Sequence, residues 1–242
     1  MKIAVVGKGG AGKTTTSAVL ARTLARSGHR VVALDCDTNP NLGLSLGIGL
    51  DATEALLSLR NGIGDDVEHA RTWDDIVERF GADAPDGVRL AMVSKIDNPD
   101  VGCPCCGVSP EQLLALDIAD DTFVVADFEA GIGTLTRLGD TKVDAVVVVT
   151  DPTVKSLEVA SRAATIAQEH TSGPLVIVAN RVLDDADRKA VERALSGRTV
   201  VLVPEDDAIP AADRAETAPL DSAPGSEAVM ALGTLASLVV GH

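Results

Sequence analysis

Short, almost wholly apolar runs recur along this chain of 242 residues, and longer stretches with helical periodicity separate them. A strand that is apolar at nearly every position is covered on both faces, as in parallel sheets packed between helices. The alternation predicts a single α/β domain, residues 1–242, with a doubly wound, mainly parallel sheet of about seven strands and helices on both faces. The predicted strands are Lys2–Val6, Arg30–Leu34, Val88–Val93, Phe123–Asp127, Ala145–Thr150, Leu175–Ala179 and Val200–Val203. The predicted helices are Lys13–Ser27, Trp73–Phe80, Pro110–Leu116, Val154–His170, Asp185–Leu195 and Ser226–Val240, and two turn-rich stretches are expected to be surface loops, Gly81–Gly87 and Ala215–Gly225.

A glycine-rich loop lies between the first predicted strand and the first predicted helix and satisfies the pattern G-x-x-x-x-G-K-[ST]. Glycines let the backbone curl so that successive N–H groups point at phosphate oxygens, and the helix N-terminus adds positive potential. We expect Lys13 to reach the β- and γ-phosphates of a nucleotide and the Thr14 hydroxyl to ligate Mg²⁺. The nucleotide-binding loop predicted here consists of Gly7, Lys8, Gly9, Gly10, Ala11, Gly12, Lys13, Thr14 and Thr15.

The charge of the chain argues against two classes of partner. Its 36 acidic and 21 basic residues give a formal net charge of −15, which opposes binding to nucleic acid or to an anionic membrane surface. No apolar run is long enough to span a bilayer, and the N-terminal sequence lacks the features of a signal peptide. Closely spaced cysteines rarely bridge each other, so the thiols are expected to be reduced and the protein to be cytoplasmic.

Lys8, a second lysine near the start of the loop, gives the sequence K-G-G-x-G-K-T-T. This resembles the deviant Walker A motif of the MinD/ParA/nitrogenase-iron-protein group of P-loop ATPases, and the resemblance covers the whole chain. It implies a Mg²⁺-dependent ATPase that hydrolyses ATP to ADP and phosphate and is a homodimer when ATP is bound. It also implies that Lys8 crosses the two-fold interface and touches the nucleotide of the partner subunit.

Acidic residues follow two of the predicted strands, where parallel strands face a ligand crevice. The sequence LDCDTNPN resembles the first switch of the same ATPases, which implies that Asp37 orients the attacking water and that Asp35 supports Mg²⁺ or the loop. Asp127 ends another apolar strand, where a carboxylate can hold the Mg²⁺ shell as a Walker B aspartate does. Gly131, four residues later, can bring its backbone N–H close to a γ-phosphate without steric cost.

The ends of the last two predicted strands resemble the adenine pocket of this group. One strand is followed by Asn180 and Arg181, and the other by Pro204, Glu205 and Asp206. The resemblance implies that the Asn amide and the backbone of the P-x-D segment read the base edge. A guanine-reading N-K-x-D motif is absent from the sequence, so we expect ATP rather than GTP.

Three cysteines, Cys103, Cys105 and Cys106, lie within four residues of one another in a predicted loop. Thiolates are soft ligands that suit Zn²⁺, Ni²⁺, Cu⁺ or iron–sulfur clusters. A C-x-C pair supplies two of the four ligands of a closed tetrahedral site, and a two-fold dimer would supply the other two. Cys36 stands alone in the sequence and is expected to be a small buried residue.

Several segments together resemble the CooC-type ATPases, which are nickel-insertion accessory proteins of carbon monoxide dehydrogenase maturation. The resemblance implies a homodimer that binds Ni²⁺ or Zn²⁺ through Cys103 and Cys105 of both subunits and assists metal insertion into a client metalloenzyme. Cys106 is an additional thiol in this motif, so which two of the three sulfurs bind metal stays open. The matching segments are Gly102–Cys105, Asp127–Ile132, Thr136–Gly139, Val143–Val149 and Asp151–Leu157.

Two other classes of protein fit the sequence less well than a metal-handling ATPase does. A MinD-like or ParA-like positioning switch would need a basic C-terminal helix or a basic surface, but Ser226–His242 contains no Lys or Arg. An electron-transfer protein like the nitrogenase iron protein would hold its cluster with cysteines from two separate segments, whereas these cysteines share one loop. We therefore predict a metal-handling ATPase.

Overall fold

The computed structural model describes residues 1–37, 40–61, 77–78, 81–92, 114, 118–129, 142–171 and 173–241. Within these ranges, no helix combines the length and the apolar character needed to cross a membrane.

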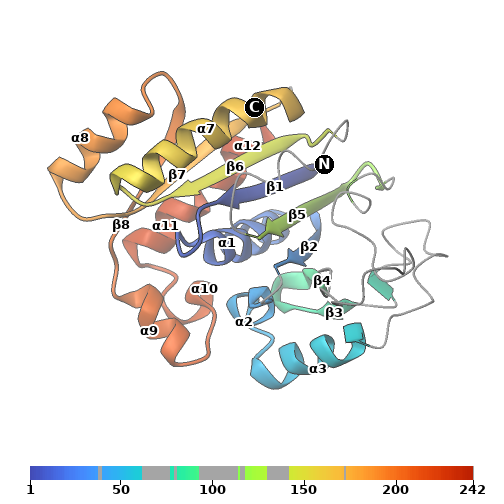
Figure 1. Cartoon of the computed structure of the whole chain (residues 1–242). Coiled ribbons are helices and arrows are strands. Elements are labelled where there is room, and N and C mark those ends of the chain that lie inside the picture. The colour runs from blue at the N-terminus through green and yellow to red at the C-terminus, as the bar shows by residue number, and fades with distance from the viewer. Residues whose placement is uncertain are drawn as a thin grey trace, which may run out of the picture.

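The described residues form one eight-stranded sheet, in the order β3-β4-β2-β5-β1-β6-β7-β8 (Figure 1). All neighbouring strands pair in parallel apart from β3, which pairs antiparallel with β4 at one edge. The central strands β5 and β6 are buried along their whole length because helices cover both sheet faces. The strands are β1 (Lys2–Gly7), β2 (Arg30–Cys36), β3 (Gly81–Asp83), β4 (Arg89–Met92), β5 (Thr122–Phe128), β6 (Ala145–Thr150), β7 (Leu175–Val182) and β8 (Thr199–Pro204).

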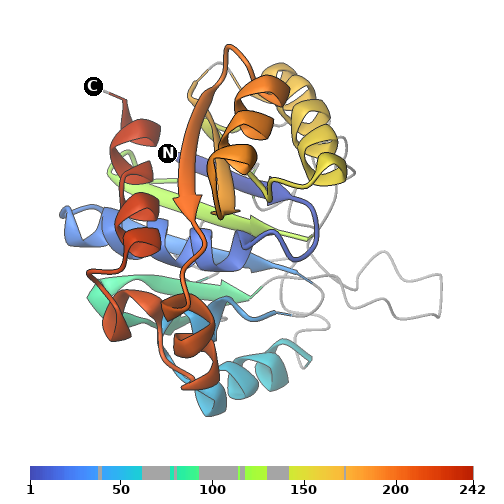
Figure 2. The ribbon, with the colours of Figure 1, turned by 90° about the vertical axis from the view of Figure 1, so that its left-hand side faces the viewer.

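Two layers of helices enclose the sheet and divide the core into two clusters. One cluster lies between the sheet and α1, α2, α11 and α12, and the other lies between the sheet and α7 and α8. Figure 2 shows this separation, with α11 and α12 in red on one side of the sheet and α7 and α8 on the other. The helices are α1 (Lys13–Arg26), α2 (Leu42–Leu46), α3 (Leu50–Asn61), α7 (Val154–His170), α8 (Asp185–Ala194), α9 (Ala208–Arg214), α10 (Pro219–Ser222), α11 (Glu227–Gly233) and α12 (Leu235–Val240), with a 3-10 turn, η2, at Pro85–Gly87.

The predicted α/β class and doubly wound topology are confirmed, and β6 and α7 have the predicted bounds. Both predicted surface loops are wrong in part, because the first contains β3 and η2 and the second contains α10. The predicted helix Ser226–Val240 is two helices, because Thr234 N donates to Ala231 O in a tighter turn. The helices predicted at Trp73–Phe80 and Pro110–Leu116 fall largely outside the described residues.

The topology places a crevice at the end of β1. This strand lies at the centre of the sheet between β5 and β6, where the direction of strand succession reverses. Ligands of doubly wound proteins bind at such a switch point, beyond the carboxyl ends of the strands. The glycine-rich loop follows β1 directly and leads into α1.

Candidate functional site

The glycine-rich loop folds as the sequence predicts, between a buried strand and a helix N-terminus. Gly7 ends β1 with a φ of +152°, and a Cβ there would lie 2.1 Å from Val149 O of β6. Gly12 has a φ of +100° immediately before α1, and a Cβ there would lie 2.3 Å from Asn180 Nδ2. Any side chain at these two positions would therefore clash with the neighbouring strands or with Asn180.

The start of α1 has the features of an anion site. Among the described residues no side chain caps this helix, and its first turn contains no acidic residue. The first amides therefore keep their capacity to donate to a phosphate. Lys13 is only 7% exposed at this helix end, whereas Gly9 and Gly10 are exposed and Lys8, Thr14 and Thr15 are partly buried.

Two buried carboxylates lie beside this helix end. Asp35 of β2 and Asp127 of β5 are directly paired in the sheet register, and each is 1% exposed. Burial raises the pKa of Asp35 to about 7, the neighbouring Asp127 charge adds to this effect, and donation from Leu42 N and Asp37 N opposes it. Burial likewise raises the pKa of Asp127 to about 6, and hydrogen bonds from the hydroxyls of Thr14 and Ser17 oppose this rise. Desolvated carboxylates that repel each other are stabilised by a cation between or beside them.

These groups fit a magnesium ion by their chemistry. The donor set is composed of oxygen, namely the carboxylates of Asp35 and Asp127 and the hydroxyl of Thr14. Hard cations such as Mg²⁺ prefer oxygen ligands and take further ones from nucleotide phosphates and water. The Ser17 hydroxyl donates to Asp127 Oδ1 at 3.0 Å and would orient that carboxylate.

The first-switch segment folds back onto Asp35. Asp37 N donates to Asp35 Oδ1 at 3.2 Å, and Leu42 N donates to Asp35 Oδ2 at 2.9 Å. Asp37 is partly buried at the end of β2, on the same sheet edge as the glycine-rich loop. The adjoining Thr38 and Asn39 are outside the described residues.

A cavity of about 440 Å³ extends from the glycine-rich loop to the ends of β7 and β8. It brings together Gly12 and Thr15 with the residues predicted for base recognition. Residues that the sequence interpretation missed form the rest of its lining, and they come from α2, α9 and α10. The lining residues are Gly12, Thr15, Leu44, Ser45, Asn180, Arg181, Pro204, Glu205, Asp206, Ile209, Pro210, Asp213, Thr217 and Pro219.

Two polar side chains of this lining are already engaged with the backbone. Asn180 Nδ2 donates to Ala11 O at 2.8 Å, so the amide holds the glycine-rich loop against β7. The carboxylate of Asp206 accepts from Ala208 N at 2.9 Å and from Ala228 N at 3.2 Å. These bonds lower the pKa of Asp206, with the bond from Ala208 as the largest cause. The Asp206 side chain therefore fixes the turn that follows β8.

The predicted γ-phosphate contact and the predicted thiolate ligands belong to segments that the structure does not describe. Gly131, Cys103, Cys105 and Cys106 lie outside the described residues. Cys36 is described and is 5% exposed, as expected for a small buried residue. In the described part of the chain, no group of three or more His, Cys, Asp or Glu side chains is arranged to hold a metal ion.

Comparisons with known proteins find similarity over most of the chain. The model of the CobQ/CobB/MinD/ParA nucleotide binding domain matches residues 2–220. The chain is 31% identical over 246 residues to the carbon monoxide dehydrogenase accessory protein CooC of Rhodospirillum rubrum, with coverage of 93% of this chain and 91% of that protein. It is also 31% identical over 199 residues to an ATP-binding protein of Methanocaldococcus jannaschii, with coverage of 76% of each chain. The septum site-determining protein MinD of Pyrococcus horikoshii, solved with Mg-ADP, has the same fold with a TM-score of 0.69 at 21% identity, over 97% of this chain and 93% of that one.

Proposed function

Because this chain belongs to the CobQ/CobB/MinD/ParA nucleotide-binding family and is a P-loop ATPase, we propose that it couples ATP hydrolysis to the handling of a transition metal. ATP binds each subunit and closes a homodimer, and the dimer carries Ni²⁺ or Zn²⁺ to a client metalloenzyme. The metal is the cargo of this reaction, and Mg²⁺ accompanies the nucleotide.

The cavity between the glycine-rich loop and β8 carries the ATPase part of the proposal. Its volume of about 440 Å³ suits a nucleotide-sized ligand, and it begins at the helix end that attracts phosphate. In this assignment, the triphosphate lies on residues 7–15 beside Lys13, and the base lies against Asn180 and the backbone of residues 204–206. Gly131 approaches the γ-phosphate through its N–H.

The acidic residues then divide the work of hydrolysis. Asp127 and Thr14 would hold Mg²⁺, which would supply positive charge at the phosphates, while Asp35 supports the site and the first switch. Asp37 orients the attacking water, because it sits at the end of β2 with its backbone tied to Asp35. Lys8 contributes across the two-fold axis to the nucleotide of the partner subunit, so that ATP joins the two subunits.

The metal part of the proposal is supported by the sequence and by the similarity to CooC, whose name links it to carbon monoxide dehydrogenase. Cys103 and Cys105 of two subunits supply four thiolates to one metal ion, with Cys106 as the alternative ligand. Because this thiolate site forms only in the dimer, ATP, which closes the dimer, would also control metal binding. The protein acts in the cytoplasm, and neither a nucleic acid nor a membrane is among its partners.

Cysteine variants test the metal site. We expect the double variant Cys103→Ser/Cys105→Ser to lose Ni²⁺ or Zn²⁺ in equilibrium dialysis under anaerobic conditions while retaining ATP binding. Cys36→Ser is the matched control and should keep the metal, because Cys36 is buried beside the first switch. Cys106→Ser decides between the two ligand sets. If the double variant binds metal as tightly as the wild type, the protein is better described as a MinD-like or ParA-like switch with incidental cysteines.

A further inference from the structure

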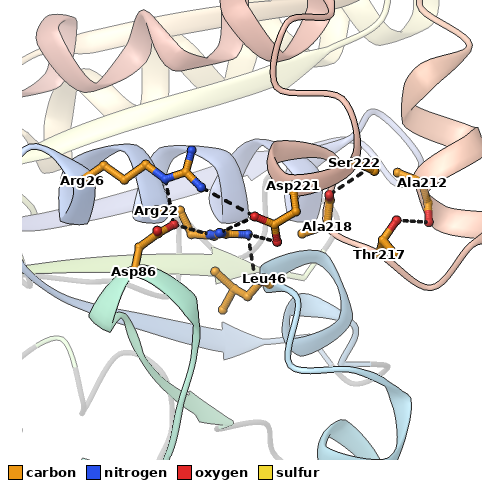
Figure 3. Close-up of polar contacts among 9 residues, drawn as sticks. All are labelled: Arg22, Arg26, Leu46, Asp86, Ala212, Thr217, Ala218, Asp221 and Ser222. Atoms are coloured by element: carbon orange, nitrogen blue, oxygen red, sulfur yellow. Dashed lines mark hydrogen bonds and ion pairs between the residues drawn. The ribbon is translucent and has the colours of Figure 1, made fainter.

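A buried arginine on α1 makes contacts that the proposed chemistry does not use. Arg22 is 2% exposed and is among the largest fully buried side chains of the described residues. Its Nε donates to Asp86 Oδ2 at 2.6 Å, and its two terminal nitrogens donate to the two oxygens of Asp221 at 2.6 and 2.7 Å. Nη1 also donates to Leu46 O at 3.3 Å. Figure 3 shows these contacts converging on one guanidinium group.

The contacts join segments that are remote in the sequence. Asp221 lies in α10, and Leu46 is the last residue of α2, so one guanidinium fixes both short helices to α1. The next residue, Gly47, has a φ of +95°, and a Cβ there would lie 3.2 Å from Asp221 Oδ2 and 3.3 Å from Ala218 Cβ. The end of α2 and the start of α10 are therefore packed directly against each other around Arg22.

Both of these helices contribute lining to the nucleotide cavity. Leu44 and Ser45 of α2 line it, and so do Pro219 of α10 and Thr217 just before that helix. Leu46 directly follows Ser45, and Asp221 is two residues beyond Pro219. Helices of five and four residues cannot hold their own conformation in water, so their position depends on such tertiary contacts.

A bidentate pair with a carboxylate is well suited to this task. It fixes the orientation of both partners as well as their distance, which a lysine cannot do. The Arg22 hydrogen bond is the main cause that lowers the pKa of Asp221, so the pair is ionised near neutral pH. Arg26 adds a second cation, which donates to Asp86 at 2.9 Å and lies 3.6 Å from Asp221.

We propose that Arg22 and Asp221 are positioning residues for nucleotide recognition, which hold α2 and α10 in place as part of the cavity wall. In the proposed position of ATP, the base and ribose lie against these two helices, so the pair sets affinity for the nucleoside part of ATP and not for its phosphates. The other end of α2 has its own anchor, because Leu42 N donates to Asp35 Oδ2, so the magnesium and phosphate side of the site does not depend on Arg22. This inference rests on the proposed position of ATP in the cavity.

Comparing two ligands in binding experiments separates this role from a general effect on folding. The probes are Mg-ATP and Mg-tripolyphosphate, which share the phosphate chain and differ in the nucleoside. The variants are Arg22→Lys and Asp221→Asn, of which the second is the safer, since the Asp221 side chain is 47% exposed. Val191→Ala is the control for lost stability, because Val191 is buried in the core on the opposite face of the sheet. Calorimetry gives each dissociation constant, and steady-state kinetics give KM and kcat.

In Asp221→Asn, the dissociation constant for ATP should rise about tenfold if the wall is assembled about one tenth of the time. The constant for tripolyphosphate should stay at the wild-type value, and KM should rise while kcat is retained. Three results would overturn the role of Arg22 and Asp221 while leaving the proposed position of ATP intact. They are an equal loss of affinity for both probes, an unchanged affinity for ATP, and the same loss of ATP affinity in Val191→Ala. A wild-type protein that binds tripolyphosphate but not ATP would overturn the proposed position of the nucleotide, and the inference with it.

Discussion

Replacing Asp127 with Asn should stabilise the nucleotide-free protein while removing its response to Mg-ATP. In the wild type, the pKa of Asp127 is raised by burial from 3.8 to about 6, so the native state binds more protons than the unfolded state between these pH values. Stability therefore falls as the pH rises through this window, and the loss is complete above it. Asparagine carries no charge, keeps an oxygen that can accept from Ser17, and escapes this cost.

The magnitude follows from the same pKa. A rise from 3.8 to about 6 in a fully buried group corresponds to about 3 kcal/mol of unfolding free energy at pH 8. For a domain of this size, that is an increase in melting temperature of roughly 6–12 °C. The substitution also removes the repulsion between the Asp127 charge and Asp35, which raises the pKa of Asp35 in part. The effects at the two residues therefore both increase the stability of the native state.

Thermal and denaturant unfolding at pH 8 and at pH 4, with and without Mg-ATP, measures both effects. The Asp127→Asn protein should melt above the wild type at pH 8, the difference should shrink toward pH 4, and Mg-ATP should raise the melting temperature of the wild type only. Asp185→Asn is the control for removal of an acidic charge, since the Asp185 side chain is 90% exposed. If nucleotide-free Asp127→Asn is less stable than the wild type at pH 8, the charge of the buried Asp127 carboxylate does not destabilise the native state.

Three further substitutions test the nucleotide site. Lys13→Ala should abolish ATP binding in calorimetry, because it removes the buried cation that we propose faces the β- and γ-phosphates, and normal ATP affinity would contradict the proposed role of the glycine-rich loop. Asp37→Ala should bind Mg-ATP, hydrolyse it slowly and accumulate as an ATP-bound dimer in light scattering, whereas unchanged turnover would exclude Asp37 from positioning water. Gly12→Ala should weaken ATP binding, since the new Cβ would lie 2.3 Å from Asn180 Nδ2 at a φ of +100°, and wild-type affinity would show that the loop can move without cost.

The fold was predictable from the sequence where segments are long and strongly patterned. The strands around β1 are nearly continuous runs of Val, Ile, Leu and Ala, and the glycine-rich loop has a fixed spacing. The short elements were missed because their own sequences are too brief to show a period. The helices α2 and α10 have five and four residues and are held by contacts to Arg22, which lies 199 residues from Asp221 in the chain.

The candidate site likewise has features that the sequence predicts and features that depend on tertiary packing. Asp35 and Asp127 could be identified as residues at strand ends, but their direct pairing depends on β2 lying beside β5, which a single sequence does not reveal. Asn180 was predicted near the base, and the structure adds its bond to Ala11 O of the glycine-rich loop. The cavity lining from α2, α9 and α10 had no sequence motif and followed only from tertiary packing.

In the proposed function, two chains share one metal ion under the control of ATP. The most direct test of this sharing is the metal and nucleotide content per chain of anaerobically purified protein, measured with the oligomeric state in ATP and in ADP. We expect half an equivalent of Ni²⁺ or Zn²⁺ and one nucleotide per chain in an ATP-bound dimer. A full equivalent of metal per chain, or no metal with either nucleotide, would contradict it.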